Sequence, residues 1–152
     1  MTTAKELSIV VLCYKAEKNI INFVHQLIQS INTLTENYEI ILVCNYFPPI
    51  PEKTTKIVKE LAKKDKRIKS ISKIKQGMMG WDMNEGMKAA QGDYICVIDG
   101  DGQFPIESIT SVYTLIKKTE ADFVKTYRVK RQDGLHRIII SKVFNSVFNI
   151  LF

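Results

Sequence analysis

Short apolar runs alternate along this chain with segments in which apolar residues recur every three or four positions. The short runs are rich in β-branched residues, which is typical of buried strands. They cover residues 7–13, 38–43, 68–74, 94–98 and 121–127. The helical spacing predicts helices over residues 20–31, 52–64, 105–118 and 135–152, and a glycine-bearing stretch over 76–93 leads into one more short helix.

Strands that alternate with helices are typical of an α/β protein with a mostly parallel sheet. We therefore expect a single domain over residues 1–152, with helices on both faces of the sheet. The run at 68–74 alternates apolar and polar residues, which predicts a half-buried or edge strand. In parallel sheets of this kind, ligands bind at the carboxyl ends of the strands.

Composition adds an expectation about partners. The 22 Lys and Arg residues outnumber the 16 Asp and Glu residues, and the net charge of +6 favours an anionic partner such as nucleotide, lipid phosphate, nucleic acid or a membrane surface. The three cysteines are widely spaced, which indicates buried thiols and a reducing cytoplasm. No stretch reaches the ~20 apolar residues that a membrane span needs.

Residues 94–105, YICVIDGDGQFP, carry the clearest chemical signal. In an extended segment alternate side chains point the same way, so Asp99, Asp101 and Gln103 would converge. Two carboxylates and an amide oxygen suit Mg²⁺ or Mn²⁺ holding a diphosphate. Glycines 100 and 102 would let the backbone bend and a ligand approach.

Other interpretations of this motif are weaker. A purely structural one is an acidic turn that caps the next helix. An EF-hand calcium loop is excluded because its sixth and twelfth positions would be Phe104 and Thr110 instead of glycine and glutamate. The chain also has neither GxxxxGK[ST] nor a GxGxxG between a strand and a helix.

Four segments in this order resemble the family 2 glycosyltransferases with the GT-A nucleotide-diphospho-sugar transferase fold, an α/β/α sandwich. The segments are LCYKAEKNI, EIILVCN, GMMGWDMNEGMKAAQGDY and VIDGDGQFP. The resemblance is greatest to polyprenyl-phosphate and dolichol-phosphate sugar transferases. That family continues beyond the last predicted helix, so the resemblance implies a domain that is truncated at its C-terminus.

The resemblance also implies roles for individual residues. Asp99, Asp101 and Gln103 would bind the metal. The catalytic residues would be Asp99, Asp101 and Arg128. The nucleotide-sugar would contact Tyr14, Glu17, Asn45, Gly77, Gly80, Asp82, Asp99, Arg137 and Ser141.

Some positions depart from the family pattern. Leu12, Lys15 and Ala16 replace the proline, asparagine and glutamate that accompany the tyrosine. Cys44 and Asn45 stand in place of the family's aspartate pair, and the Asn45 amide can still hydrogen-bond a base edge. Asp82 has two interpretations of equal weight, as a helix cap or as a nucleotide contact.

The implied function is metal-dependent transfer of a sugar, with inversion, from a UDP- or GDP-sugar to a polyprenyl phosphate or a cell-surface glycan. The cofactor would be Mg²⁺ or Mn²⁺, and the protein would be cytoplasmic, with peripheral contact at the cytoplasmic membrane face. One alternative is a non-catalytic sugar-nucleotide-binding domain, and another is a basic nucleic-acid-binding module. A pyrophosphorylase is disfavoured because CYKAEKN lacks glycine.

Three further features concern packing and surfaces instead of chemistry. The basic stretch over 53–75 lacks interleaved aromatic residues, so we expect a solvated helix face instead of a nucleic-acid surface. Trp81 and the methionines at 78, 79, 83 and 87 are expected to pack in the core more readily than to line an acceptor pocket. In a complete enzyme the broad apolar stripe of the last helix would pack on the sheet or touch the membrane that holds a lipid acceptor. In a truncated domain its exposed part would favour a homo-oligomer.

Overall fold

A computed structural model describes residues 5–49, 53–127, 143 and 146 of the chain. The four strands in these ranges are β1 (Lys5–Leu12), β2 (Tyr38–Val43), β3 (Ile68–Ile71) and β4 (Gly92–Asp99). The helices are α1 (Asn19–Ile31), α2 (Lys53–Lys64), α3 (Met79–Ala89) and α4 (Glu107–Thr119). The predicted alternation of strands and helices is confirmed through α4. Most elements begin or end a few residues away from the predicted bounds.

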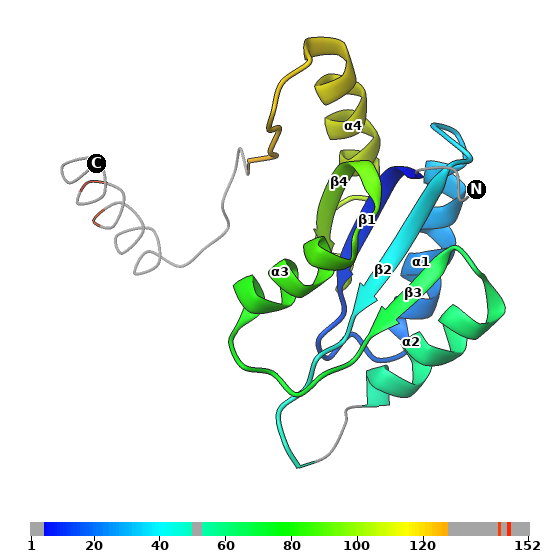
Figure 1. Cartoon of the computed structure of the whole chain (residues 1–152), viewed down its shortest axis with the longest axis vertical. Coiled ribbons are helices and arrows are strands. Elements are labelled where there is room, and N and C mark those ends of the chain that lie inside the picture. Colours follow the sequence, from blue (N-terminus) through cyan, green and yellow to red (C-terminus); the bar gives the residue numbers. More distant parts are fainter. Residues whose placement is uncertain (1–4, 50–52, 128–142, 144–145, 147–152) are drawn as a thin grey trace.

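All pairings in the sheet are parallel, in the order β3-β2-β1-β4 (Figure 1). The central strand β1 is apolar on both sides, and Leu7, Ile9, Val10 and Val11 are almost fully buried. A strand covered on both faces reads as a continuous apolar run, as parallel sheets require. The predicted edge position of the third strand is confirmed, because β3 pairs only with β2 among the described residues.

Helices cover both faces of the sheet, as expected. Helix α1 buries one stripe at helical spacing, formed by Ile20, Phe23, Val24, Leu27 and Ile31. This stripe shares one hydrophobic cluster with residues from α2 and α4, including Val58 and Ile109. Helix α3 lies on the opposite face, over a smaller cluster that contains Val10, Ile41 and Val43.

Gly86 brings α3 unusually close to the sheet. A methyl group at this position would overlap the side chain of Val10 and lie 2.9 Å from Cγ2 of Val43. Only glycine therefore fits where the helix crosses β1 and β2. The close approach also sets the position of the first turn of α3, which lies beside the carboxyl ends of the strands.

Buried polar groups fasten the opposite end of the sheet. Glu39, only 1% exposed, accepts hydrogen bonds from Ser8 Oγ at 2.8 Å and from the Gln91 N–H at 2.7 Å. Lys69 Nζ lies 2.7 Å from its second carboxylate oxygen. Burial raises the pKa of Glu39, but the hydrogen bonds from Lys69, Ser8 and Gln91 outweigh it and leave the pKa below its ordinary value.

One predicted strand is wrong. Residues 121–127 are irregular, and Phe123 and Tyr127 are 76% and 81% exposed. The segment lies along one side of a cavity beside β4 but buries too little apolar surface to hold an extended pairing. The strand predicted over 68–74 is shorter than expected, since its ladder ends at Ile71 and only an isolated bridge joins Tyr46 to Ile74. The last predicted helix falls almost wholly outside the described residues.

Two of the three cysteines are buried as expected, and Cys96 is partly buried. None of the three forms a disulfide, and Cys13 and Cys44 are buried. Burial raises the pKa of Cys96 to about 11 and that of Cys13 well above its usual value. Both thiols therefore stay protonated near neutral pH, which fits a packing role.

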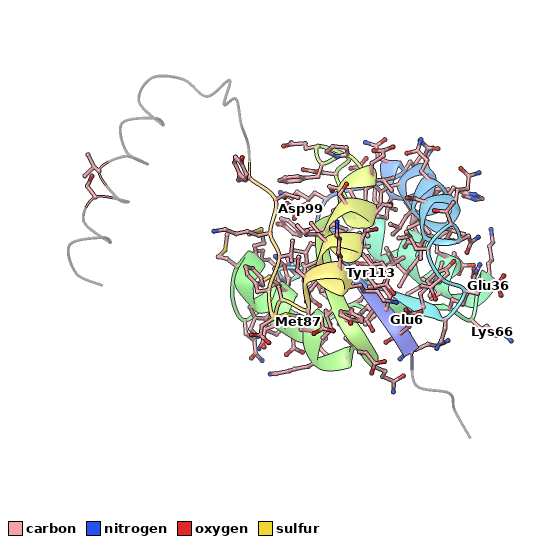
Figure 2. All side chains as sticks on the ribbon, turned by 90° about the horizontal axis from the view of Figure 1, so that it is seen from above. Glu6, Glu36, Lys66, Met87, Asp99 and Tyr113 are labelled. Atoms are coloured by element: carbon pink, nitrogen blue, oxygen red, sulfur yellow. The ribbon has the colours of Figure 1, made fainter. Side chains whose placement is uncertain are left out.

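Glu6 ties the start of β1 to α4. Its carboxylate accepts hydrogen bonds from Lys117 Nζ, Thr35 Oγ1 and Tyr113 Oη, each at 2.6 Å. Figure 2 labels Glu6 on β1 and Tyr113 on α4. These bonds, with that from Lys117 the largest contribution, lower the pKa of Glu6 from 4.5 to about 2. Ionised Glu6 therefore stabilises the folded chain, and this contribution is complete above pH 4.5 and lost as the pH falls towards 2.

Replacing Glu6 by glutamine should therefore flatten the acid end of the stability profile. We expect the unmodified chain to lose stability between pH 4.5 and about 2, and Glu6→Gln to lose less over the same window. Urea unfolding at a series of pH values measures this. Glu36→Gln, at an exposed position, is the matched control and should follow the unmodified chain. Parallel profiles for Glu6→Gln and the unmodified chain would show that this carboxylate is not the linked group.

Candidate active site

The parallel register brings the ends of three strands together. Leu12 at the end of β1 lies opposite Val43 of β2 on one side and Asp99 of β4 on the other. Two further hydrogen bonds extend this pairing, from Cys13 N–H to Val43 O at 2.8 Å and from Gly100 N–H to Leu12 O at 2.9 Å. The residues that follow each strand therefore emerge side by side, and they include the sequence-predicted Tyr14, Asn45 and Asp101.

The motif after β4 forms a turn. The strand ends at Asp99, residues 100–102 turn, and Gly102 has a φ of +77°, which favours glycine. Asp101 Oδ1 accepts a hydrogen bond from the Gln103 N–H at 2.9 Å. The expectation of one extended segment with alternating side chains is therefore wrong beyond Asp99. The alternative interpretation, an acidic turn that caps the next helix, is wrong, because Ile106 occupies the cap of α4 and no side chain caps it.

Gly100 has a different role from the one expected. A methyl group there would lie 2.9 Å from Cγ1 of Val11 and 3.0 Å from Cδ1 of Ile20. Glycine is therefore required by packing against β1 and α1, whereas Gly102 faces open space. This packing fixes where the turn leaves the sheet.

The donor groups of this turn suit a hard cation. Asp101 and Gln103 are exposed, and Asp99 is partly buried at the mouth of the cavity beside β4. The described residues contain no group of three or more His, Cys, Asp or Glu that could hold a metal without help. Two carboxylates and an amide fit Mg²⁺ or Mn²⁺ when substrate phosphates supply the remaining ligands.

The loop after β1 presents Tyr14 in a fixed conformation. Lys15 and Glu17 both have left-handed backbones, with φ of 58° and 48°. Residues other than glycine adopt this region only when neighbouring contacts impose it. One such contact is the hydrogen bond from the Glu17 N–H to Oγ1 of buried Thr54 in α2, at 2.9 Å. The Glu17 side chain itself is exposed.

Asn45 and Asp82 belong to one buried polar network. Asn45 is fully buried, and its amide donates to Asp82 Oδ1 at 2.8 Å while its oxygen accepts from the Lys73 N–H at 2.8 Å. Asp82 forms an ion pair with Lys75, and the two side chains are 5% and 3% exposed. Asp82 does not cap α3, since the cap residue is Met78 and no side-chain hydrogen bond is made there.

Lys75 joins this network to two aromatic rings. Its Nζ lies 4.2 Å from the ring centroid of Tyr14 and 5.5 Å from that of Phe47. The basic stretch over 53–75 gave no sign of a buried lysine, and no motif marked Phe47. A signal was nevertheless present, because Lys75 directly precedes the glycine-bearing loop and Phe47 lies four residues after the end of the second strand.

The remaining predicted residues lie partly within and partly outside the described part of the chain. Gly77 is confined, since a methyl group there would lie 2.8 Å from Cβ of Trp81, whereas Gly80 lies in the first turn of α3 next to open space. Met78 and Met79 are 73% and 60% exposed, so their predicted place in the core is wrong. Three predicted residues lie outside the described ranges: Arg128, predicted to be catalytic, and Arg137 and Ser141, predicted to contact the nucleotide-sugar.

A mostly apolar cavity of about 660 Å³ lies beside the outer edge of β4. Its lining includes Met83 and Met87 of α3, Ile95 and Val97 of β4, and Asp99 at the end of the strand. These two methionines are therefore partly buried side chains at a cavity wall and not parts of a closed core.

The Lys75–Asp82 ion pair should be essential for stability. Asp82→Ala would leave the Lys75 ammonium buried without its counter-charge, which typically costs about 3–5 kcal/mol. A double variant, Lys75→Met with Asp82→Leu, should recover most of this loss. Urea unfolding, followed by the fluorescence of the single tryptophan, Trp81, measures both. Glu60→Ala, which breaks an exposed pair with Lys63, is the control and should change little. Equal midpoints for Asp82→Ala and Glu60→Ala would contradict this account.

Comparisons with solved structures bear on the fold. The crystal structure of residues 1–349 of S. aureus TarS superposes with a TM-score of 0.60 over 85% of this chain and 38% of that chain. The two sequences are 20% identical over the match. None of the helices in the described part of the chain is long and apolar enough to cross a membrane.

Comparisons of sequence bear on the family. Two proteins named undecaprenyl-phosphate 4-deoxy-4-formamido-L-arabinose transferase, from Photorhabdus laumondii subsp. laumondii and Proteus mirabilis, are 29% and 27% identical over 146 and 143 residues. The matches cover 94% and 93% of this chain and 43% of each relative. The model of glycosyl transferase family 2 matches residues 8–150, nearly the whole sequence. With that match, and a parallel sheet whose strand ends carry the expected motifs, the chain belongs to glycosyl transferase family 2 and has its GT-A fold.

Proposed function

We propose that this domain takes part in metal-dependent transfer of a sugar from a nucleoside diphosphate to a polyprenyl phosphate. The observation that carries the proposal is the Asp99–Gln103 turn, which leaves the sheet beside the ends of β1 and β2. The similar proteins from Photorhabdus and Proteus are named as transferases that act on undecaprenyl phosphate. The chain spans 43% of the length of these relatives. We therefore propose the polyprenyl phosphate acceptor by similarity to them.

Asp99, Asp101 and Gln103 would hold Mg²⁺ or Mn²⁺ together with the donor diphosphate. The bound cation would neutralise charge on the departing nucleoside diphosphate. The Asp101 carboxylate is oriented by its hydrogen bond with the Gln103 N–H, which presets part of the donor set before the ligand arrives. Packing of Gly100 against Val11 and Ile20 fixes the origin of the turn.

The chemistry is a displacement at the anomeric carbon with inversion. An acceptor oxygen forms the new bond to that carbon while the bond from the carbon to the diphosphate oxygen breaks. The leaving diphosphate keeps the electron pair of that bond. A phosphate acceptor is already an anion near neutral pH, so it needs no general base to remove a proton before it attacks.

The acceptor implies work at a membrane surface. The net charge of +6 favours an anionic surface, and Ile74, Met78 and Met79 are exposed apolar side chains near the strand ends. We therefore propose peripheral contact with the cytoplasmic face of a membrane. Arg128 and Arg137, beyond the described residues, are the proposed contacts for phosphate groups.

Calorimetric titration with UDP and GDP tests the donor site. We expect one of them to bind in the presence of Mn²⁺ and to bind weakly without it. Asp101→Ala should weaken that binding roughly tenfold or more. Even the loss of a residue that only hydrogen-bonds a metal ligand typically lowers metal affinity by about that factor. Asp93→Ala is the matched control, since Asp93 is an exposed carboxylate at the other end of the same strand.

The proposal fails if neither nucleotide binds with Mn²⁺, or if Asp101→Ala and Asp93→Ala bind equally well. A transfer assay with a UDP- or GDP-sugar and a polyprenyl phosphate then separates an enzyme from a domain that binds without turnover. Binding without transfer would support a domain that binds the sugar-nucleotide without turnover.

A further inference from the structure

Tyr14 and Phe47 form an open aromatic corner at the strand ends. Their ring centroids are 6.3 Å apart and the ring planes meet at 87°. Tyr14 follows β1 and Phe47 follows β2, and the side chains are 37% and 45% exposed. Lys15 Nζ also lies 5.2 Å from the Tyr14 centroid, so Phe47 is the ring with more exposed surface on which a planar group can stack.

The corner rests on a buried cation. Lys75 Nζ lies 4.2 Å from the Tyr14 centroid and 5.5 Å from the Phe47 centroid, and the lysine side chain is 3% exposed. A cation this deeply buried is poorly placed to meet a phosphate in solution. Its contacts instead attract both rings to one point through their negative faces.

The supports of Lys75 make that point rigid. Its ammonium pairs with Asp82, whose carboxylate accepts a hydrogen bond from the Asn45 amide at 2.8 Å. The Lys75 N–H donates to Tyr46 O at 2.8 Å, next to Phe47 in the chain. One network therefore joins the ends of β2 and β3 to the first turn of α3. Such a preorganised surface loses little entropy when it binds a ligand.

From these contacts we propose that Phe47 is a nucleobase-contacting residue, paired with Tyr14, and that Lys75 is the positioning residue for both rings. This rests on the proposed function, because the planar ligand is taken to be the base of the donor nucleotide. The strained loop at Lys15 and Glu17, held by Thr54, supports it, since imposed left-handed residues cluster at ligand sites.

A nucleobase fits this corner better than the isoprenoid chain of the acceptor does. The base offers a flat π-face for stacking and polar edges for the nearby backbone, whereas an isoprenoid chain needs only apolar area. Stacking on an aromatic side chain is tolerant of base identity. The corner therefore fixes where the base lies and leaves the choice among bases to its edge contacts.

Variants at Phe47 separate stacking from apolar contact. Stacking on an aromatic side chain strengthens the binding of a base. Phe47→Ala should therefore weaken binding of UDP or GDP about 5- to 100-fold, with Mn²⁺ present. Phe47→Tyr should bind like the unmodified chain, and Phe47→Leu should bind like Phe47→Ala. Inorganic pyrophosphate, which has no base, should bind all of them equally. Leu115→Ala, at 47% exposure on α4, is the control for loss of an exposed apolar side chain.

The positioning role of Lys75 needs its own variant. Lys75→Met combined with Asp82→Leu removes the ion pair without leaving a buried charge. This double variant should weaken nucleotide binding several-fold while pyrophosphate binding stays unchanged. A merely structural role would affect both ligands alike or neither. Circular dichroism and urea unfolding confirm that each variant is folded before titration.

Three results would overturn the proposal about Phe47. One is nucleotide binding that survives Phe47→Ala, which would leave the proposed donor function standing. A second is Phe47→Leu binding like the unmodified chain, which would indicate an apolar or isoprenoid ligand. A third is equal weakening of nucleotide and pyrophosphate. Absence of any nucleotide binding by the unmodified chain would overturn the donor function and this proposal together.

Discussion

The parallel pairing of β1 with both β2 and β4 determines which side chains meet at the carboxyl ends of the strands. It places Leu12 between Val43 and Asp99, so three chain segments leave the sheet at one edge. Each segment carries residues of a different kind: an aromatic ring, a buried amide and an acidic turn. Because all strands run the same way, these groups meet without any strand having to reverse, as in other open α/β sheets.

The two halves of that edge differ in rigidity. Around Asn45, Asp82 and Lys75, polar groups are buried and satisfy one another, so their arrangement is fixed before any ligand binds. The turn with Asp101 and Gln103 is exposed and is held by one hydrogen bond between them. Base recognition by the first half and metal binding by the second would divide the donor nucleotide between a rigid support and an adaptable one.

Much of the fold was predictable because its signals are local. The continuous apolar run of β1 and the helical stripe of α1 both follow from burial on known faces. The segment 121–127 has apolar residues, but Phe123 and Tyr127 stay exposed in the fold, which sequence cannot reveal. Asp82 was recognised as important but left between two roles, and its true partner Lys75 was hidden within a run of exposed lysines. Such long-range pairing depends on register, which only the folded chain displays.

NMR spectroscopy can show whether the metal and the donor diphosphate bind at the Asp99–Gln103 turn. In two-dimensional ¹H–¹⁵N spectra of the labelled chain, Mn²⁺ added with UDP or GDP broadens the amide signals nearest to it. We expect broadened amide signals around Asp99–Gln103 and the end of β1, and sharp signals at Gln91 and Gly92 at the far end of the sheet. Broadening centred on the far end, or on the lysines of α2, would contradict this expectation.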